Sequence, residues 1–249
     1  MIAALRKILR EFGDLFQNKK QRKLLLSEIN KKTYLSSYIV RVTTDTKWKA
    51  LREAIGWLKT SQDAMKDDGF GTYYLQSGWT SSYPETSGYI VPTILNFAQK
   101  EGDEDLKERA KKALDWLLKI QKPSGGWQSG YVHQNKAEIV FNTGQVIRGM
   151  IAGYHHFNEE KYLKSAQKAA DWLVTIQAEN GSFDKHVYMD AVRVYDSYVV
   201  APVLELNAIT PKPAYVELAE KNINWVLREK QNDLGWFADC DNTIAGNST

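Results

Sequence analysis

The sequence predicts an all-α fold in which about four similar helical hairpins are arranged as an incomplete ring. Three observations support this prediction. A tryptophan followed five residues later by glutamine recurs along the chain, with one extra residue in the last copy. A glycine and an aromatic residue follow each glutamine, and an apolar segment follows each of the first three turns. The tryptophans are Trp57, Trp116, Trp172 and Trp225, so the repeats are 59, 56 and 53 residues long.

Each repeat begins as an amphipathic helix. In the second copy Ala110, Ala113, Leu114, Leu117 and Ile120 recur with the spacing of one helical face. The glycine after each glutamine is a stop signal, because glycine adopts positive φ at little cost. We predict helices over residues 48–62, 89–101, 105–121, 145–157, 160–178, 199–208 and 213–231.

The second helix of each repeat is apolar on most sides, which is typical of a helix buried inside a ring. Prolines at 92 and 202 bear on where these helices begin, because proline fits the first helical turn and kinks a helix elsewhere. Helices starting near Tyr89 and Val199 would leave Glu85 and Asp196 in the preceding loops. The alternative is that both residues cap the helices.

The Gln121-x3-Gly125-x-Trp127 unit resembles the repeat of the terpenoid-cyclase and prenyltransferase α/α toroids. The alternation of outer helix, loop and inner helix is similar to the six-hairpin glycosidases, polysaccharide lyases and sugar epimerases. This resemblance implies an incomplete (α/α) toroid over residues 48–249, preceded by a basic helical segment over residues 1–47. It implies less about the reaction, since one ring supports many chemistries.

The ring is expected to be incomplete. The inner helices begin near residues 85, 142 and 196, so a fourth is due near residue 250. Either the chain is a fragment of a longer protein, which we favour, or the open end of the ring is covered by self-association, by a partner or by the N-terminal helices.

Composition narrows the class of protein. No apolar run is long enough to span a membrane, and the first residues lack the apolar core of a signal peptide, which favours a cytoplasmic location. Cys240 is the only cysteine, so no internal disulfide forms. Residues 1–49 hold 12 Lys and Arg against 4 Asp and Glu. We interpret this stretch as a solvated helix face and expect no nucleic-acid partner.

Three loops lead from a glycine-aromatic turn to an inner helix, and in a ring they meet at one end. They share tyrosine, tryptophan, histidine, and carboxylates or amides, a mixture that suits a sugar: aromatic faces contact the ring and polar groups contact the hydroxyls. We predict a carbohydrate ligand. The candidate catalytic residues are Glu85, Asp196 and His133, and the candidate substrate-binding residues are Trp79, Tyr83, Tyr131, Asn142, Arg193 and Tyr195.

The reaction stays open between three classes of enzyme. Two carboxylates from neighbouring hairpins suit a glycoside hydrolase. A lyase or epimerase would need a base such as His133 or Tyr131, with Arg193 or Asn142 neutralising a uronate. A non-catalytic binding or scaffold toroid is the second class of hypothesis.

An isoprenoid enzyme is the third hypothesis and is disfavoured, because no Asp-x-Asp-Asp motif occurs. We predict no metal and no cofactor, since no set of ligands has the spacing of a zinc site. The four repeated tryptophans are predicted to lie in the core.

Overall fold

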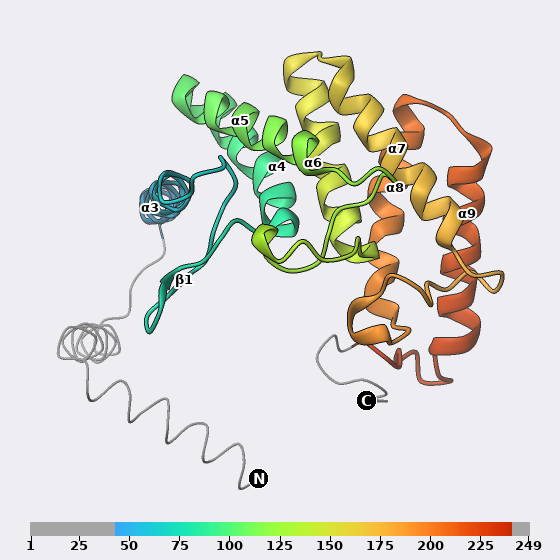
Figure 1. Ribbon diagram of the computed structural model, residues 1–249. Helices are drawn as coiled ribbons and strands as arrows, with labels where there is room; N and C mark the ends of the chain where they lie inside the picture. Colours follow the sequence, from blue (N-terminus) through green and yellow to red (C-terminus); the bar gives the residue numbers. More distant parts are fainter. Residues whose placement is uncertain (1–42, 241–249) are drawn as a thin grey trace, which may run out of the picture. The chain divides into compact units, whose positions relative to one another are not determined.

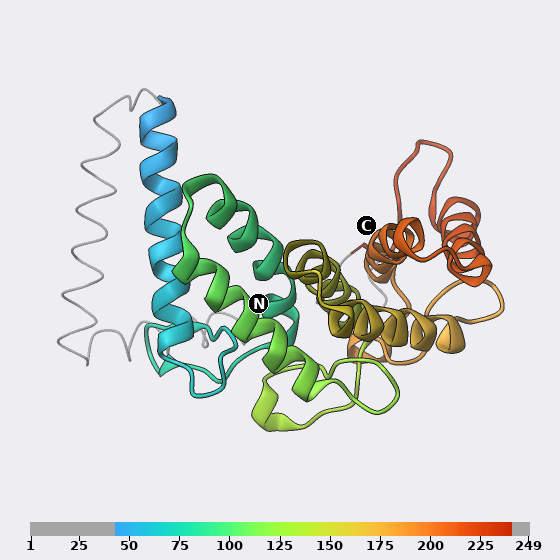
Figure 2. The same ribbon diagram turned by 90° about the horizontal axis from the view of Figure 1, so that it is seen from above.

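The computed structural model describes residues 43–240 (Figures 1 and 2). The predicted basic segment over residues 1–47 therefore lies almost entirely outside the described residues and stays a prediction. The helices and strands are α3 (Thr44–Asp63), β1 (Tyr73–Tyr74), β2 (Gly78–Trp79), α4 (Pro84–Glu101), α5 (Glu104–Ile120), η1 (Val132–Gln134), α6 (Val140–Phe157), α7 (Glu160–Ile176), η2 (Tyr188–Asp190), η3 (Val194–Val199), α8 (Val200–Ile209), α9 (Pro213–Trp225) and η4 (Val226–Lys230).

The chain divides into two compact units. One holds the residues up to Leu58 together with Thr72–Thr80, which contain most of α3 and the antiparallel β1–β2 hairpin. The other holds Lys59–Gly71 and the residues from Ser81 onward. Within the larger unit, α4, α6 and α8 pack in sequence beside one another, and α5, α7 and α9 form a second layer against them. The predicted all-helical toroid architecture is confirmed.

Helix α5 shows why the outer helices form. Its buried residues Leu106, Ala110, Ala113, Leu114 and Leu117 follow one helical face, and the opposite face is charged. Asp103 caps its start, because the side chain accepts a hydrogen bond of 2.9 Å from the backbone N–H of Leu106.

The glutamine of each of the first three repeats joins two successive outer helices, and we call this contact the glutamine bridge. One carboxamide Nε2 donates both to the carbonyl of its own glycine turn and to a carbonyl seven residues before the next repeat's tryptophan. The pairs are Gln62 with Asp68 (2.8 Å) and Arg109 (3.0 Å), Gln121 with Gly125 (2.8 Å) and Ser165 (3.0 Å), and Gln177 with Gly181 (3.0 Å) and Leu218 (2.9 Å).

Close backbone approach accompanies two of these bridges. Gly125 and Gly181 have φ of +118° and +93°, and a Cβ on either would collide with a carbonyl of the next outer helix, at Lys168 or Lys221. Only glycine combines this backbone conformation with this contact. The turn glycine is therefore required both by the positive φ of its own turn and by the close contact with the next outer helix.

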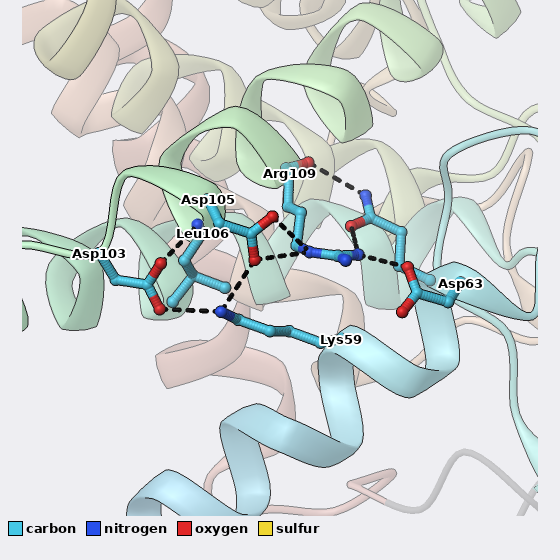
Figure 3. A network of polar contacts seen from close by, with 7 residues as sticks. Lys59, Asp63, Asp103, Asp105, Leu106 and Arg109 are labelled. Atoms are coloured by element: carbon cyan, nitrogen blue, oxygen red, sulfur yellow. Dashed lines mark hydrogen bonds and ion pairs between the residues drawn. The ribbon is translucent and has the colours of Figure 1, made fainter.

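A network of ion pairs between side chains joins the end of α3 to the start of α5 within the larger unit (Figure 3). Lys59 Nζ lies 2.9 Å from both Asp103 Oδ2 and Asp105 Oδ2, and Arg109 Nη1 lies 2.6 Å from Asp63 Oδ1. Because these groups are partly exposed, each pair contributes at most about 1 kcal/mol. The network therefore makes the packing of α3 against α5 more specific, next to the glutamine bridge between the same two helices.

The inner helices begin earlier than the sequence predicted. α4 starts at Pro84 and α6 at Val140, not near 89 and 145, whereas α8 starts at Val200 close to the prediction. Pro84 occupies the first turn, where its missing N–H costs nothing. Pro92 lies inside α4 and cannot donate to the carbonyl of Gly88.

That carbonyl faces the neighbouring helix instead. A Cβ on Gly149 of α6 would come within 2.6 Å of Gly88 O, and a Cβ on Gly88 within 2.7 Å of Val146 Cα. Gly144 meets Val199 in the same way, at 2.5 Å from its Cγ1. These glycines of α4 and α6 therefore allow the neighbouring inner elements to approach closely. This contact accommodates Pro92, which helix geometry alone disfavours.

Three of the four repeated tryptophans lie in the core of the described structure. Trp116, Trp172 and Trp225 are buried, and Trp116 lies against the turn glycine Gly69 of the repeat before it. Trp57 is 52% exposed, so the prediction that all four are buried is wrong for this one. Each buried tryptophan packs beside the preceding repeat, and Trp57 belongs to the first repeat.

The fourth repeat carries one extra residue between Trp225 and Gln231. The backbone absorbs it in η4, a π-helical turn in which Gln231 N donates to Val226 O at 3.1 Å. Gln231 Nε2 then reaches its own turn at Gly235 O, 3.3 Å away. Among residues 43–240, no helix has the length and apolar content needed to cross a membrane.

We expect Trp116→Ala to lower the free energy of unfolding by about 3–5 kcal/mol, because it empties a large buried site. Chemical denaturation measures the loss. Trp57→Ala is the matched control and should cost less than half as much, since that ring is half exposed. A loss below about 1 kcal/mol for Trp116→Ala would contradict the assigned core.

Candidate functional site

The N-terminal ends of three inner elements carry most of the predicted site residues. Glu85 lies in the first turn of α4, Asn142 in the first turn of α6, and Tyr195 and Asp196 in η3 just before α8. These elements pack side by side, α4 against α6 and α6 against η3. Residues more than 100 positions apart in the chain therefore meet at one end of the inner layer.

The predicted loop positions need correction. Glu85 lies inside α4, because the helix begins at Pro84. Capping does not explain it either: the residue at the N-cap is Tyr83, whose side chain makes no capping bond, and for α6 it is Ile139. Asp196 lies in the η3 turn, ahead of α8. The three polar side chains are thus free of a helix-capping role.

A hydrogen-bonded group joins α4 to α6. The Tyr83 hydroxyl bonds to the Glu85 carboxylate and also interacts with the Asn142 amide. Asn142 is buried, and its Nδ2 donates to Gln128 O at 2.9 Å, which holds the amide in one orientation. The group therefore presents a carboxyl, a phenol and an amide in fixed positions.

Burial changes the proton affinity of this group. Desolvation raises the pKa of Glu85 above its ordinary value, and the hydrogen bond from Tyr83 opposes the rise. Desolvation, with the charge of Glu85, also raises the pKa of Tyr83. A carboxyl that keeps its proton more readily than a free glutamate is suited to act as a general acid.

Aromatic rings surround the group on two sides. The Tyr83 and Tyr131 rings are 5.8 Å apart, and His133 stacks on Tyr131 at 6.0 Å with 9° between the planes. On the other side Phe141 stacks on Tyr195 at 3.9 Å. His133 lies in η1 with its side chain exposed. Flat faces next to polar groups are the combination that binds a sugar ring.

Arg193 and Asp196 lie behind this surface. Both side chains are buried, with 3% and 2% exposure. Arg193 Nη1 donates to Tyr188 O at 2.6 Å, whereas Arg193 Nε and Nη2, Asp196 Oδ1 and Ser197 Oγ have no hydrogen-bond partner. Neither Arg193 nor Asp196 presents its charge at the surface, although both were predicted to contact a ligand.

Trp79 belongs to the smaller unit. Its ring stacks on Trp57 at 5.3 Å and meets Tyr73 edge to face at 5.2 Å. These three rings form an aromatic cluster of their own beside the β-hairpin. The structure therefore gives Trp79 a partner that the sequence did not suggest, because the contact joins α3 to β2.

Two further observations bear on ligands. Within residues 43–240, no three His, Cys, Asp or Glu side chains are grouped so that they could hold a metal ion. An open hollow of about 610 Å³ lies elsewhere, near the end of α7 and the end of α9, and none of the predicted site residues line it. Its walls include Glu179, Asp184, Trp225, Glu229 and Lys230.

Sequence reasoning missed three residues on the exposed face of the inner helices. Tyr89 lies one turn after Glu85 on α4, Arg148 lies two turns after Phe141 on α6, and Tyr198 follows Tyr195 in η3. Helical spacing of four residues from the predicted Glu85 could have found Tyr89, whereas no predicted site residue lies four or seven residues before Arg148.

Comparison with known proteins identifies the family. The sequence model described as "Beta-L-arabinofuranosidase, GH127 catalytic domain" matches residues 40–236. The chain belongs to this family. The match covers most of the chain and includes every candidate site residue.

Solved structures share the GH127-like chain's fold at low sequence identity. The Lin0763 protein of Listeria innocua has a TM-score of 0.61 and 14% identity, covering 80% of this chain and 60% of that one. A GH76 alpha-mannanase of Bacteroides thetaiotaomicron has a TM-score of 0.58 and 14% identity, and the match covers 80% of this chain and 56% of that one. An alpha-amylase of Clostridium perfringens has a TM-score of 0.55 and 12% identity, and the match covers 74% of this chain and 56% of that one.

The chain thus spans between 56% and 60% of the length of these three structures. No curated protein matches the sequence. The predicted likeness to the six-hairpin glycosidases is confirmed, and with it a carbohydrate-active family.

We expect Asp196 to make stability depend on pH. Burial raises its pKa to about 7, and the Arg193 guanidinium offsets this only in part. The neutral carboxyl then stabilises the fold fully below the pKa of an unfolded aspartate, about 4, and this stabilisation is lost as pH rises through about 7. Denaturation at several pH values should show a loss of up to roughly 4 kcal/mol in this window.

Asp196→Asn should abolish this pH dependence and be the more stable protein at pH 8. Asp184→Asn, an exposed aspartate of the same loop, is the control and should keep the slope of the unmodified protein. An unchanged slope in Asp196→Asn would show that the buried carboxyl titrates normally.

Proposed function

We propose that the chain binds a glycan against the exposed N-terminal face of α4, α6 and η3 and hydrolyses a glycosidic bond there. The observation that carries the proposal is the Tyr83–Glu85–Asn142 group, in which a carboxyl with a raised pKa lies between aromatic rings. The family description supplies the first substrate to test, a β-L-arabinofuranoside.

Glu85 has the acid–base role in this proposal. In its protonated form it donates a proton to the leaving-group oxygen as the glycosidic C–O bond breaks. A water molecule then adds to the anomeric carbon and returns a proton to the Glu85 carboxylate. The Tyr83 hydroxyl bonds to the carboxylate that remains and stabilises it. Asn142 is buried and its amide is fixed by Gln128, so we assign it the role of holding the Tyr83 hydroxyl beside Glu85.

The remaining predicted residues support this centre. Tyr131 and His133 offer stacked, accessible rings to a sugar on one side, and Tyr195 does so on the other. Asp196 and Arg193 are buried beneath, so we assign them the role of holding the η3 turn that carries Tyr195. A second carboxylate acting directly on the substrate would require Asp196 to become exposed.

A binding protein without catalysis is the second candidate. The burial of Asp196 favours it, because hydrolysis by paired carboxylates needs both groups at the substrate. The same aromatic and amide groups would then hold a glycan without cleaving it. Binding that survives the loss of Glu85, with no turnover of any glycoside, would support this candidate.

We also propose that the chain associates with a second copy through the edge of its fourth repeat. In the first three repeats the turn aromatic, Phe70, Trp127 or Phe183, is buried. In the fourth repeat Trp236 is 72% exposed and Leu234 is 84% exposed. Gln231 bonds its own turn but has no carbonyl of a following outer helix among residues 43–240.

Helix α3 carries the other half of this repeated contact. Its exposed Trp57 corresponds to Trp116 and Trp172, which lie against turn glycines of the preceding repeat, Gly69 and Gly126. Ala50 stands seven residues before Trp57, at the position that accepts the glutamine bridge in α5, α7 and α9. The two ends therefore match as head and tail of a heterologous interface.

Mixing two variants tests the association. Trp236→Ala damages the fourth-repeat edge and Trp57→Ala damages the α3 face, so each variant alone should be monomeric by analytical ultracentrifugation. A mixture of the two should form dimers, because one intact edge then meets one intact face. An unmodified protein that stays monomeric at every concentration, or a mixture that stays monomeric, would exclude this contact.

We expect Glu85→Gln to reduce the turnover of an aryl β-L-arabinofuranoside by at least about 100-fold, since a general acid contributes 10²–10⁴. Glu217→Gln, an exposed glutamate of α9, is the control and should leave turnover unchanged. Circular dichroism and thermal unfolding show whether the fold is kept. Full turnover in a folded Glu85→Gln variant would remove Glu85 from the mechanism.

A further inference from the structure

A second set of exposed side chains lies one helical turn beyond Glu85. Tyr89 is on α4, Arg148 on α6 and Tyr198 on η3, so three neighbouring inner elements contribute one residue each. Tyr89 is 40% exposed and Tyr198 is 47% exposed. We call these three residues the arginine subsite.

A close backbone contact between α4 and α6 shows that Tyr89 and Arg148 lie at the same level along the two helices. A Cβ on Gly149 would lie 2.6 Å from Gly88 O, so the turn of α6 that carries Arg148 is level with the turn of α4 that carries Tyr89. Both follow the Tyr83–Glu85–Asn142 group in the same direction along parallel chain segments. The spacing from Glu85 to Tyr89 is four residues, or about 6 Å of helix rise, which is close to the length of one sugar ring.

Arg148 has one partner on the protein. Its Nη1 donates to the Tyr198 hydroxyl, and its guanidinium lies 5.5 Å from the centre of the Tyr198 ring. A guanidinium has five N–H donors, so four have no acceptor within residues 43–240. No carboxylate in that range forms an ion pair with Arg148, whereas Lys59, Lys111, Lys161 and Lys212 on or near the outer helices are all paired.

The charge of Arg148 is isolated on this face. In the described chain it is the one lysine or arginine within the first three turns of α4 and α6 or within residues 194–204. The nearest predicted site cation, Arg193, is buried and bonds to backbone carbonyls. An anion at this level would therefore meet a guanidinium that bonds to the exposed Tyr198 and has no ion-pair partner within residues 43–240.

We propose that Tyr89, Arg148 and Tyr198 form a subsite for a sugar ring that bears a negatively charged group. The proposal deepens the proposed function, since it places an acidic sugar next to the bond at Glu85. The guanidinium bonds the anion through two parallel N–H donors, a geometry that carboxylates match well. The tyrosine rings contact the faces of the sugar, and neutral sugars lose only the ionic contact.

Three matched probes test the subsite: methyl β-D-glucuronoside, methyl β-D-glucoside and methyl β-D-glucoside 6-sulfate. Affinities are measured by isothermal titration and by protein-observed NMR. We expect the full chain to bind the glucuronoside at least about tenfold more tightly than the neutral glucoside, as for one charge-assisted contact. The sulfate probe shows whether the site prefers a carboxylate or accepts either anion.

Arg148→Gln should remove the preference for the charged probe and leave the affinity for the neutral glucoside unchanged. Arg148→Lys keeps the charge but not the paired donors, and should recover only part of the preference. Lys112→Gln, an exposed lysine of α5 on the outer layer, is the control for net charge and should retain the full preference.

The two proposals fail separately. Equal affinity for the charged and neutral probes, or a preference that survives Arg148→Gln, would overturn the arginine subsite while Glu85-dependent turnover still stands. A preference that depends on Arg148, in a protein without any glycosidase activity, would keep the subsite and remove the acid–base role of Glu85. Failure to bind any of the three probes would also overturn the subsite.

Discussion

A single glutamine carboxamide per repeat holds the outer layer together. Its two N–H donors bond two carbonyls, one in the turn that ends its own helix and one in the next outer helix. Both acceptors are backbone groups, so the contact does not depend on the neighbouring side chains. The bridge therefore sets the distance and the register between successive outer helices, and the turn glycine must follow because the two backbones touch there.

This register reaches the inner layer through the short loops. Among the outer helices, each inner helix packs mainly against the one that follows it, α4 against α5, α6 against α7 and α8 against α9. The glycines at 88 and 149 bring α4 and α6 into backbone contact, and Gly144 allows Val199 to approach α6 closely. The first turns of α4 and α6 then lie at the same level, which brings Glu85 and Asn142 to one phenol. A change of register by one helical turn would separate them by about 5 Å and break the group.

Charge is distributed differently over the two layers. On the outer layer, lysines and arginines pair with carboxylates at exposed positions, as in the network around Lys59 and Arg109 (Figure 3). These pairs are screened by water and contribute little to stability. On the inner face, Glu85 and Arg148 have no ion-pair partner within residues 43–240. Charged groups that bond only to tyrosine hydroxyls, with no ion-pair partner among the described residues, are suited to contact a ligand.

The sequence by itself determined the helical repeat, because tryptophan, glutamine and glycine recur at spacings that only a repeated hairpin explains. It also placed Glu85, Asn142 and Asp196 at the same end of the inner helices, since they share one phase of the repeat. It placed the starts of α4 and α6 about five residues too late. Local rules disfavour Pro92 inside a helix, and the close contact of Gly88 with α6 that accommodates it comes from a distant part of the chain.

Only the tertiary structure decided which of these side chains reach the surface. Asn142 and Asp196 take the repeat position of Glu85 in the sequence, yet both are buried. Trp57 repeats Trp116, yet it is half exposed. No motif distinguishes Arg148 in the sequence. Its contact with Tyr198 follows from the packing of η3 against α6. Burial depends on neighbours that are far apart in the chain, so a repeat can specify where a residue stands but not what covers it.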